Sequence, residues 1–143
     1  MNTTKKLMNL MLLSLLFIGC NLPEPDGKWA KMKWVSESDL MVDNGAYLLY
    51  QEGGSFTFKC KNYGHPWISC ITIDGTYQEI NHENPKSFKG EWVEVKMNGN
   101  NMTIIVEPLP DSLESRNFSL EVTAGDIFHH FKFSQRLNIH PWM

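Results

Sequence analysis

The chain has 143 residues, enough for one domain of ordinary size but too few for two well-packed ones. Its 13 Lys and Arg residues stand against 16 Asp and Glu, so the net charge is −3 and no basic surplus is available to bind nucleic acid. Hydrophobic residues make up 42% and charged residues 20%, which is typical of a globular protein. Five Trp residues in so short a chain are the least ordinary feature of this composition.

The first nineteen residues predict a secretory signal peptide. Lys5 and Lys6 precede an apolar stretch at 7–18, which is shorter than the ~20 residues of a membrane-spanning helix. The stretch runs into Leu-Phe-Ile-Gly-Cys at 16–20, which resembles a bacterial lipobox, although Phe17 replaces the usual Leu at the third position before the Cys. The resemblance implies cleavage before Cys20 and acylation of that Cys. The lipid bilayer is therefore a predicted partner, and the outer membrane of a bacterial cell envelope is the predicted location.

Removal of the signal peptide changes the charge of the protein. The mature chain keeps 11 basic and 16 acidic residues, a net charge of −5, because Lys5 and Lys6 are lost. We expect an acidic body on a lipid tether to stand off from anionic head groups. Two prolines and two acids after Cys20 are typical of a stiff, solvated linker. The predicted organisation is a signal peptide at 1–19, a linker at 20–30, a folded domain at 31–135 and a tail at 136–143.

Apolar and polar residues alternate along most of the mature chain, which is the period of half-buried strands. The apolar members of the alternating sets are Phe56, Phe58, Cys60, Val93, Val95, Met97, Met102, Ile104, Val106, Phe118, Leu120, Val122, Ile127, Phe131 and Phe133. Turns rich in Gly and Asn between them predict hairpins at 95–106 and 118–133. Seven to nine short strands favour an all-β fold, an antiparallel sandwich. A lipocalin-like barrel is the alternative, disfavoured by the prolines at 85, 108 and 110.

The order of several single residues carries a family resemblance. A Gly pair at 53–54 opens a strand, and Asn62, Trp67, Trp92, Arg116 and Gln135 follow in sequence. This order resembles the BACON domains of Bacteroidetes secreted proteins and lipoproteins, over residues 34–135. The resemblance implies an immunoglobulin-like β-sandwich. Because BACON domains often stand beside glycoside hydrolases, it also implies carbohydrate binding, but the family supplies no ligand-contacting motif to transfer.

Cys60 and Cys70 flank Trp67, and two interpretations of them remain open. In an exported protein they could form a disulfide, worth about 3 kcal/mol for so short a loop. Alternatively, they are free thiols that act as small apolar residues.

The sequence predicts no catalytic residue, no metal site and no cofactor. His129 and His130 are adjacent on a predicted strand, so their side chains point to opposite faces. No spacing typical of a zinc site, a nucleophile elbow or a phosphate-binding loop is present. The acids at 91, 94, 107 and 121 fall on the polar sides of strands. A hydrolase with a carboxylate pair hidden among them is the remaining enzymatic alternative.

The aromatic residues are the best indication of a binding site. Trp67 leads into an apolar strand and is predicted to be core, whereas Trp92 falls on the parity opposite Val93 and is predicted to face solvent. The candidate ligand platform comprises Tyr63, His65, Trp92, Trp29 and Trp34. The alternative is that these residues cap the ends of the sandwich. Trp142 lies in a tail that we expect to fold back onto the body.

These observations favour a non-catalytic envelope lipoprotein that binds glycan, such as mucin or polysaccharide, or a protein partner. The main alternative is a structural spacer or assembly subunit with no small ligand. One further motif, Asp111-Ser112-Leu113, resembles the acceptor for O-glycosylation of exported Bacteroidetes proteins and implies glycosylation at Ser112.

Overall fold

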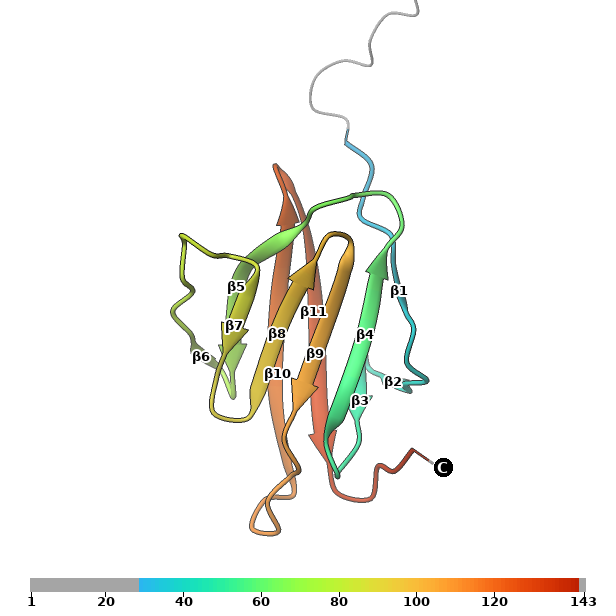
Figure 1. Cartoon of the computed structure of the whole chain (residues 1–143). Coiled ribbons are helices and arrows are strands. Elements are labelled where there is room, and N and C mark those ends of the chain that lie inside the picture. The colour runs from blue at the N-terminus through green and yellow to red at the C-terminus, as the bar shows by residue number, and fades with distance from the viewer. Residues whose placement is uncertain (1–28, 142–143) are drawn as a thin grey trace, which may run out of the picture.

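The computed structural model describes residues 29–141, which form eleven strands in two sheets (Figure 1). The first six strands are β1 (Trp34–Ser36), β2 (Val42–Asp43), β3 (Ala46–Leu49), β4 (Gly54–Cys60), β5 (Trp67–Ile73) and β6 (Thr76–Tyr77). The other five are β7 (Ser87–Lys89), β8 (Val93–Asn98), β9 (Asn101–Val106), β10 (Ser115–Ala124) and β11 (Ile127–Arg136). Within these residues there is no helix long and apolar enough to cross a membrane.

The strands form a sandwich, as predicted, and not a closed barrel. One sheet has five strands in the order β1-β4-β9-β8-β7, and the other has six in the order β2-β3-β11-β10-β5-β6. All pairs are antiparallel except β3 and β11, which run parallel. Both sheets end in strands of two or three residues, and short edges limit unwanted pairing with other chains.

The connectivity is that of an immunoglobulin-like fold, as the sequence predicted. Strands β1, β4, β9 and β8 take the places of A, B, E and D, while β5, β10 and β11 take those of C, F and G. The strand count is eleven instead of seven to nine. The difference comes from two- and three-residue strands, which are too short to show a period in the sequence.

The core lies between the sheets and is rich in stacked Phe residues. Phe58 on β4 meets Phe131 and Phe133 on β11 at ring-centroid distances of 5.5 and 5.7 Å. Phe118 stacks on Phe133 at 4.5 Å. Offset and edge-to-face contacts of this kind add to the free energy gained by burial. The predicted alternation is therefore confirmed, because the residues of one parity on these strands are buried.

The long hairpins place the loops at two opposite ends of the sandwich. The predicted hairpins are present as β8–β9 and β10–β11, and the second is longer than expected. We call the end that holds residues 29–33, the β4–β5 loop and the β8–β9 and β10–β11 turns the tether end (Figure 1). The opposite end, with the β3–β4 turn, the β9–β10 loop and residues 137–141, is the tail end.

Candidate ligand-binding site

The outer surface of the six-stranded sheet carries the best candidate site. On β5, β10 and β11 the core residues alternate with residues that point away from the other sheet. We call the outward set the outer face. Its members are Trp67, Ser69, Thr72, Tyr77, Asn117, Ser119, Glu121, Thr123, Phe128, His130 and Lys132.

An aromatic row crosses the outer face near the tether end. Thr123 on β10 pairs with Trp67 on one side and with Phe128 on the other. Thr123 is only 4% exposed, whereas Phe128 is 53% exposed and Trp67 is half-buried. Because adjacent strands lie about 4.8 Å apart, the two aromatic residues stand roughly 10 Å apart with a threonine between them. The two aromatic side chains therefore flank Thr123 on an outer face whose other residues are mostly polar.

The Thr123 hydroxyl is already engaged in the hairpin. Its Oγ1 lies 2.7 Å from the Gly125 carbonyl oxygen and 3.0 Å from that of Ile127. These contacts tie the side chain to the β10–β11 turn, where Gly125 has a φ of +66°. The hydrogen bonds within the turn thereby hold Thr123 in place between the two aromatic residues.

Polar side chains continue the face toward the tail end. Glu121 accepts a hydrogen bond from Ser69 Oγ at 2.7 Å, and its other oxygen lies 3.0 Å from His130 Nε2. The carboxylate is thus held in one orientation while the His130 side chain stays 69% exposed. Such a fixed acceptor beside aromatic rings suits hydroxyl-rich ligands, whose C–H faces stack and whose hydroxyls donate.

We call the polar side chains that face one another across β5, β10 and β11 the polar ladder. A hollow of about 290 Å³ lies beside it. Thr72 and Ser119 line it, with their hydroxyl oxygens 2.5 Å apart, and Lys132 adds a cation. Tyr77, which is 59% exposed, pairs with Thr72 from edge strand β6. Thr72 pairs with Ser119, four residues along β10 from Thr123, so this exposed ring stands beside the hollow and apart from the aromatic row.

The disulfide considered between Cys60 and Cys70 is not formed, since both are free thiols. Cys60 points into the core from β4, whereas Cys70 is half-buried on β5, in the other sheet. The register of β5 shifts between Glu121 and Val122 of its partner, so two residues separate the inward Ile68 and Ile71. Burial, and secondarily the charge of Glu121, raises the pKa of the Cys70 thiol, which keeps it protonated.

The same bulge makes the prediction for Trp67 wrong. The sequence placed Trp67 on one parity with Ile71 and Ile73, but the extra residue puts Ile68 and Ile71 inward instead. Trp67 therefore lies half-buried on the outer face and not in the core. A bulge leaves no mark in a simple period of two, which is why the sequence did not show it.

The prediction that Trp92 faces solvent is also wrong. Trp92 is only 9% exposed and belongs to the core, with its ring 5.6 Å from that of Phe118. The residue precedes β8 at a bend, so the alternation of the strand does not extend to it. Trp92 lies near the tail end and cannot join a platform with residues at the tether end.

The other predicted platform residues gather at the tether end but do not form one exposed surface. Trp34 packs edge-on against Phe131 at 5.3 Å, and Tyr63 is half-buried with its hydroxyl donating to the Ala30 carbonyl. Trp29 is 63% exposed and His65 is exposed. The interpretation that these residues cap an end holds for Trp34 and Tyr63.

Two predictions fall outside the described residues, and one falls on an exposed loop. Cys20 and Trp142 lie outside 29–141, as does the signal peptide. Ser112 is exposed in the turn between Pro110 and Leu113, where the Leu113 N–H donates to the Pro110 carbonyl. The described part of the tail folds back onto the body, as expected.

A buried polar cluster explains two of the residues behind the BACON resemblance. Arg116 is 6% exposed, with its guanidinium 4.0 Å over the Trp92 ring. It donates to Gln135 Oε1 at 2.7 Å and to the carbonyls of Glu107 and Pro108 at 2.7 and 2.9 Å. Desolvation lowers the Arg116 pKa, and the charges of Asp74 and Glu107 oppose this shift. The cluster satisfies loop carbonyls and is structural.

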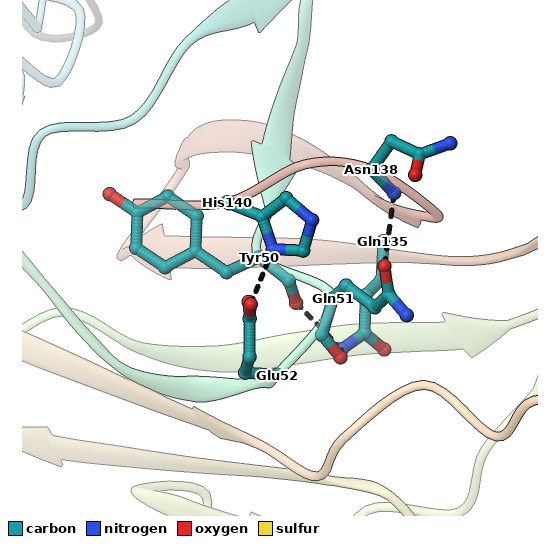
Figure 2. A network of polar contacts seen from close by, with 6 residues as sticks. All are labelled: Tyr50, Gln51, Glu52, Gln135, Asn138 and His140. Atoms are coloured by element: carbon teal, nitrogen blue, oxygen red, sulfur yellow. Dashed lines mark hydrogen bonds and ion pairs between the residues drawn. The ribbon is translucent and has the colours of Figure 1, made fainter. Parts of the chain in front are cut away.

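Gln135 extends the same cluster to the β3–β4 turn and the tail (Figure 2). Its amide donates to the Tyr50 carbonyl at 2.9 Å. The side-chain oxygen of Gln51 accepts from the Asn138 N–H at 3.0 Å, and Glu52 contacts His140 Nδ1. A hydrogen bond from its own backbone, and then that from His140, lowers the Glu52 pKa. These contacts hold the tail against the β3–β4 turn.

Sequence reasoning missed Phe128, Tyr77 and the polar ladder. Phe128 stands on the parity opposite Ile127 and Phe131, so its exposure was readable from the alternation. Tyr77 sits on a two-residue strand, and the ladder depends on pairing between β5, β10 and β11. No local signal marks such cross-strand neighbours.

Comparison with known structures relates the chain to a bacterial protein and, more distantly, to immunoglobulin-like domains. An NMR structure of a protein from Bacteroides thetaiotaomicron matches with a TM-score of 0.64 and 37% identity, over 82% of this chain and 97% of that one. The chain belongs to the same family as this Bacteroides protein. Titin domain M7 and the titin Z1Z2 domains also match, at 11% and 13% identity and TM-scores of 0.42, over 76% of this chain and over 96% and 49% of theirs. No protein-family profile matches, and no curated protein is significantly similar.

Proposed function

We propose that this member of the family is a lipid-anchored, non-catalytic envelope protein that binds a glycan chain on its outer face. The observation that carries the proposal is the gathering of Trp67, Phe128 and Tyr77 on one face of one sheet, beside hydroxyls and a fixed carboxylate. Sugar rings present apolar faces that stack on aromatic rings, and their hydroxyls need polar partners nearby. A sheet face offers both at a fixed spacing.

The chemistry of the face favours binding over hydrolysis. A glycosidase needs two carboxylates on either side of the scissile bond. The ladder between β5, β10 and β11 supplies Glu121, whose two oxygens are occupied by Ser69 and His130. Within residues 29–141, no group of three or more metal-ligating side chains was found to assist a reaction. The face therefore suits a ligand that is held and not cleaved.

The envelope location rests on the sequence. The lipobox-like stretch ending at Cys20 supports acylation, and the described chain starts at the tether end (Figure 1). The BACON-like order of residues supports a surface or periplasmic role, because BACON domains occur in secreted proteins and lipoproteins. Lipidation is tested by growth with a labelled fatty acid: label must enter the wild-type chain and be lost in Cys20→Ala.

A glycan array tests the binding site. The chain from residue 21 onward is suited to this, because the family relative, nearly all of which aligns here, folds in solution. We expect Phe128→Ala and Trp67→Ala each to weaken binding about ten- to a hundredfold, since each removes a stacking ring of roughly 1.5–3 kcal/mol. Leu113→Ala, an exposed apolar residue at the tail end, is the control and should change nothing.

The outcomes separate the alternatives. If Trp29→Ala abolishes binding while Phe128→Ala does not, the site includes Trp29, a member of the platform predicted from the sequence, and not the outer face. If no glycan of the array binds the wild-type chain, the proposal fails and the structural-spacer alternative takes its place.

A further inference from the structure

The tether end carries a concentration of positive charge in a protein that is acidic as a whole. Lys31, Lys33 and Lys61 are all exposed there. Their backbones are joined, because the Lys61 N–H donates to the Lys33 carbonyl at 2.8 Å. Asn62 braces the same segment, donating to the Lys31 carbonyl at 2.9 Å and accepting from the Lys33 N–H at 2.8 Å. The three lysines therefore sit on a fixed piece of backbone.

These lysines are not used in ion pairs within the part of the chain that the structure describes. The nearby β4–β5 loop has no acid. Two exposed acids lie close to this end: Asp126 in the β10–β11 turn, and Glu83, two residues before Pro85, whose carbonyl accepts from the Ile68 N–H at the start of β5. The tail end has the opposite character. Its exposed acids are Glu52, Glu107, Asp111 and Glu114. The molecule is thus polarised along its long axis, with cations at the tether end.

Trp29 adds an apolar contact to the same end. Its side chain is 63% exposed and directly precedes the segment with Lys31 and Lys33. Trp is enriched at the boundary between lipid and water, where its ring lies at the level of the head groups. An exposed Trp beside lysines is the combination that peripheral proteins use to lie on anionic membranes.

We propose that the tether end docks on anionic phospholipid head groups through Lys31, Lys33, Lys61 and Trp29. The proposal gains force from the proposed lipid anchor, because the nine residues from Cys20 to Lys28 span at most about 30 Å. The tether end would always lie within that distance of the bilayer. Attraction of the lysines is local, since the Debye length is about 8 Å at physiological salt, so the acids at the tail end are screened.

Docking would orient the domain. With the tether end on the lipid, the outer face stands at the side of the molecule and the acidic tail end points away (Figure 1). This replaces the expectation from net charge alone, that an acidic body stands clear of the membrane. It also leaves the aromatic row open to a glycan running along the surface.

Vesicle sedimentation tests the proposal without the anchor. The chain from residue 21 onward is mixed with vesicles of equal parts phosphatidylcholine and phosphatidylglycerol, or of phosphatidylcholine alone. Each lysine near an anionic surface should raise the partition coefficient about fivefold, so three lysines predict a preference for the anionic vesicles of roughly a hundredfold. Added salt should reduce this preference steeply.

Matched variants identify the surface. Lys33→Gln/Lys61→Gln should lower partition to anionic vesicles by about twenty-five-fold. Lys89→Gln/Arg136→Gln removes the same charge toward the tail end, from β7 and from the end of β11, and should leave partition nearly unchanged. Trp29→Ala should weaken binding to both vesicle types. Equal partition of the wild-type chain to the two vesicle types, or equal loss in both double variants, overturns the proposal. Fatty-acid labelling at Cys20 tests the anchor separately, so either idea can fail alone.

Discussion

At the scale of single residues, Arg116 at the tail end is unusual because no carboxylate forms an ion pair with it. Arg116 is buried against Trp92 and donates hydrogen bonds to Gln135 and to two backbone carbonyls. A planar guanidinium can reach several acceptors at once, which an ammonium group cannot. The charge is tolerated because every polar side-chain atom buried in the described residues has a partner.

Arg116→Lys should therefore destabilise the fold although it conserves the charge. The ammonium loses the fork of hydrogen bonds and leaves the Pro108 carbonyl and the Gln135 side-chain oxygen without the donor they had, at a cost of about 3 kcal/mol. The Glu107 carbonyl keeps its hydrogen bond from the Gln135 amide. Urea unfolding measures this loss. Arg136→Lys is the control, because its ion pair with Asp43 is 43% and 41% exposed, and such pairs contribute under about 1 kcal/mol. Similar losses in both variants would contradict this account of Arg116.

At the scale of elements, the β3–β4 turn depends on one glycine. Gly53 has a φ of +74°, and a Cβ there would lie 2.2 Å from the Val106 carbonyl oxygen. Gly53→Ala should cost about 3 kcal/mol or more, because the clash with backbone adds to the strain of the left-handed conformation. Gly125→Ala provides the comparison, with a φ of +66° and nothing within 4 Å, and should cost only about 1 kcal/mol. Thermal unfolding of the two variants separates the cost of the clash, which Gly53→Ala alone carries, from the cost of the left-handed conformation, which both variants carry.

The tail is a second element to consider, and its stability depends on pH. The Glu52 pKa is lowered in the folded state, so its contacts stabilise the tail above the usual value of 4.5 and are lost as pH falls through the lowered folded-state value. We expect backbone amides near Asn138 to lose protection against hydrogen exchange, relative to the intrinsic rate at each pH, on acidification below that range. In Glu52→Gln, protection should already be low at neutral pH and change little on acidification. An unchanged pH profile in this variant would show that another group controls the tail.

How far the sequence predicts the structure also depends on the element. The hairpins β8–β9 and β10–β11 and the alternating core were readable, because long strands with Gly or Asn turns give a clear period. The outer face was not, since it arises from register between strands distant in the chain and from a bulge in β5. Trp67 and Trp92 exchanged their expected roles for these local reasons, one at the bulge and one at a bend before β8.

At the scale of the whole molecule, stability comes from a continuous core and not from a cross-link. Cys60 and Cys70 lie on β4 and β5, in opposite sheets, and both are free. Dithiothreitol should therefore leave the urea midpoint of the chain from residue 21 onward unchanged. Phe131→Ala should lower its stability by about 3–5 kcal/mol, because Phe131 contacts the rings of Phe58 in the five-stranded sheet and Tyr47 in the six-stranded sheet. Mass spectrometry of protein unfolded without reductant and then alkylated should find both thiols modified. Recovery of a protected pair, together with a midpoint that falls on reduction, would show that a disulfide forms and that the core alone does not account for the fold.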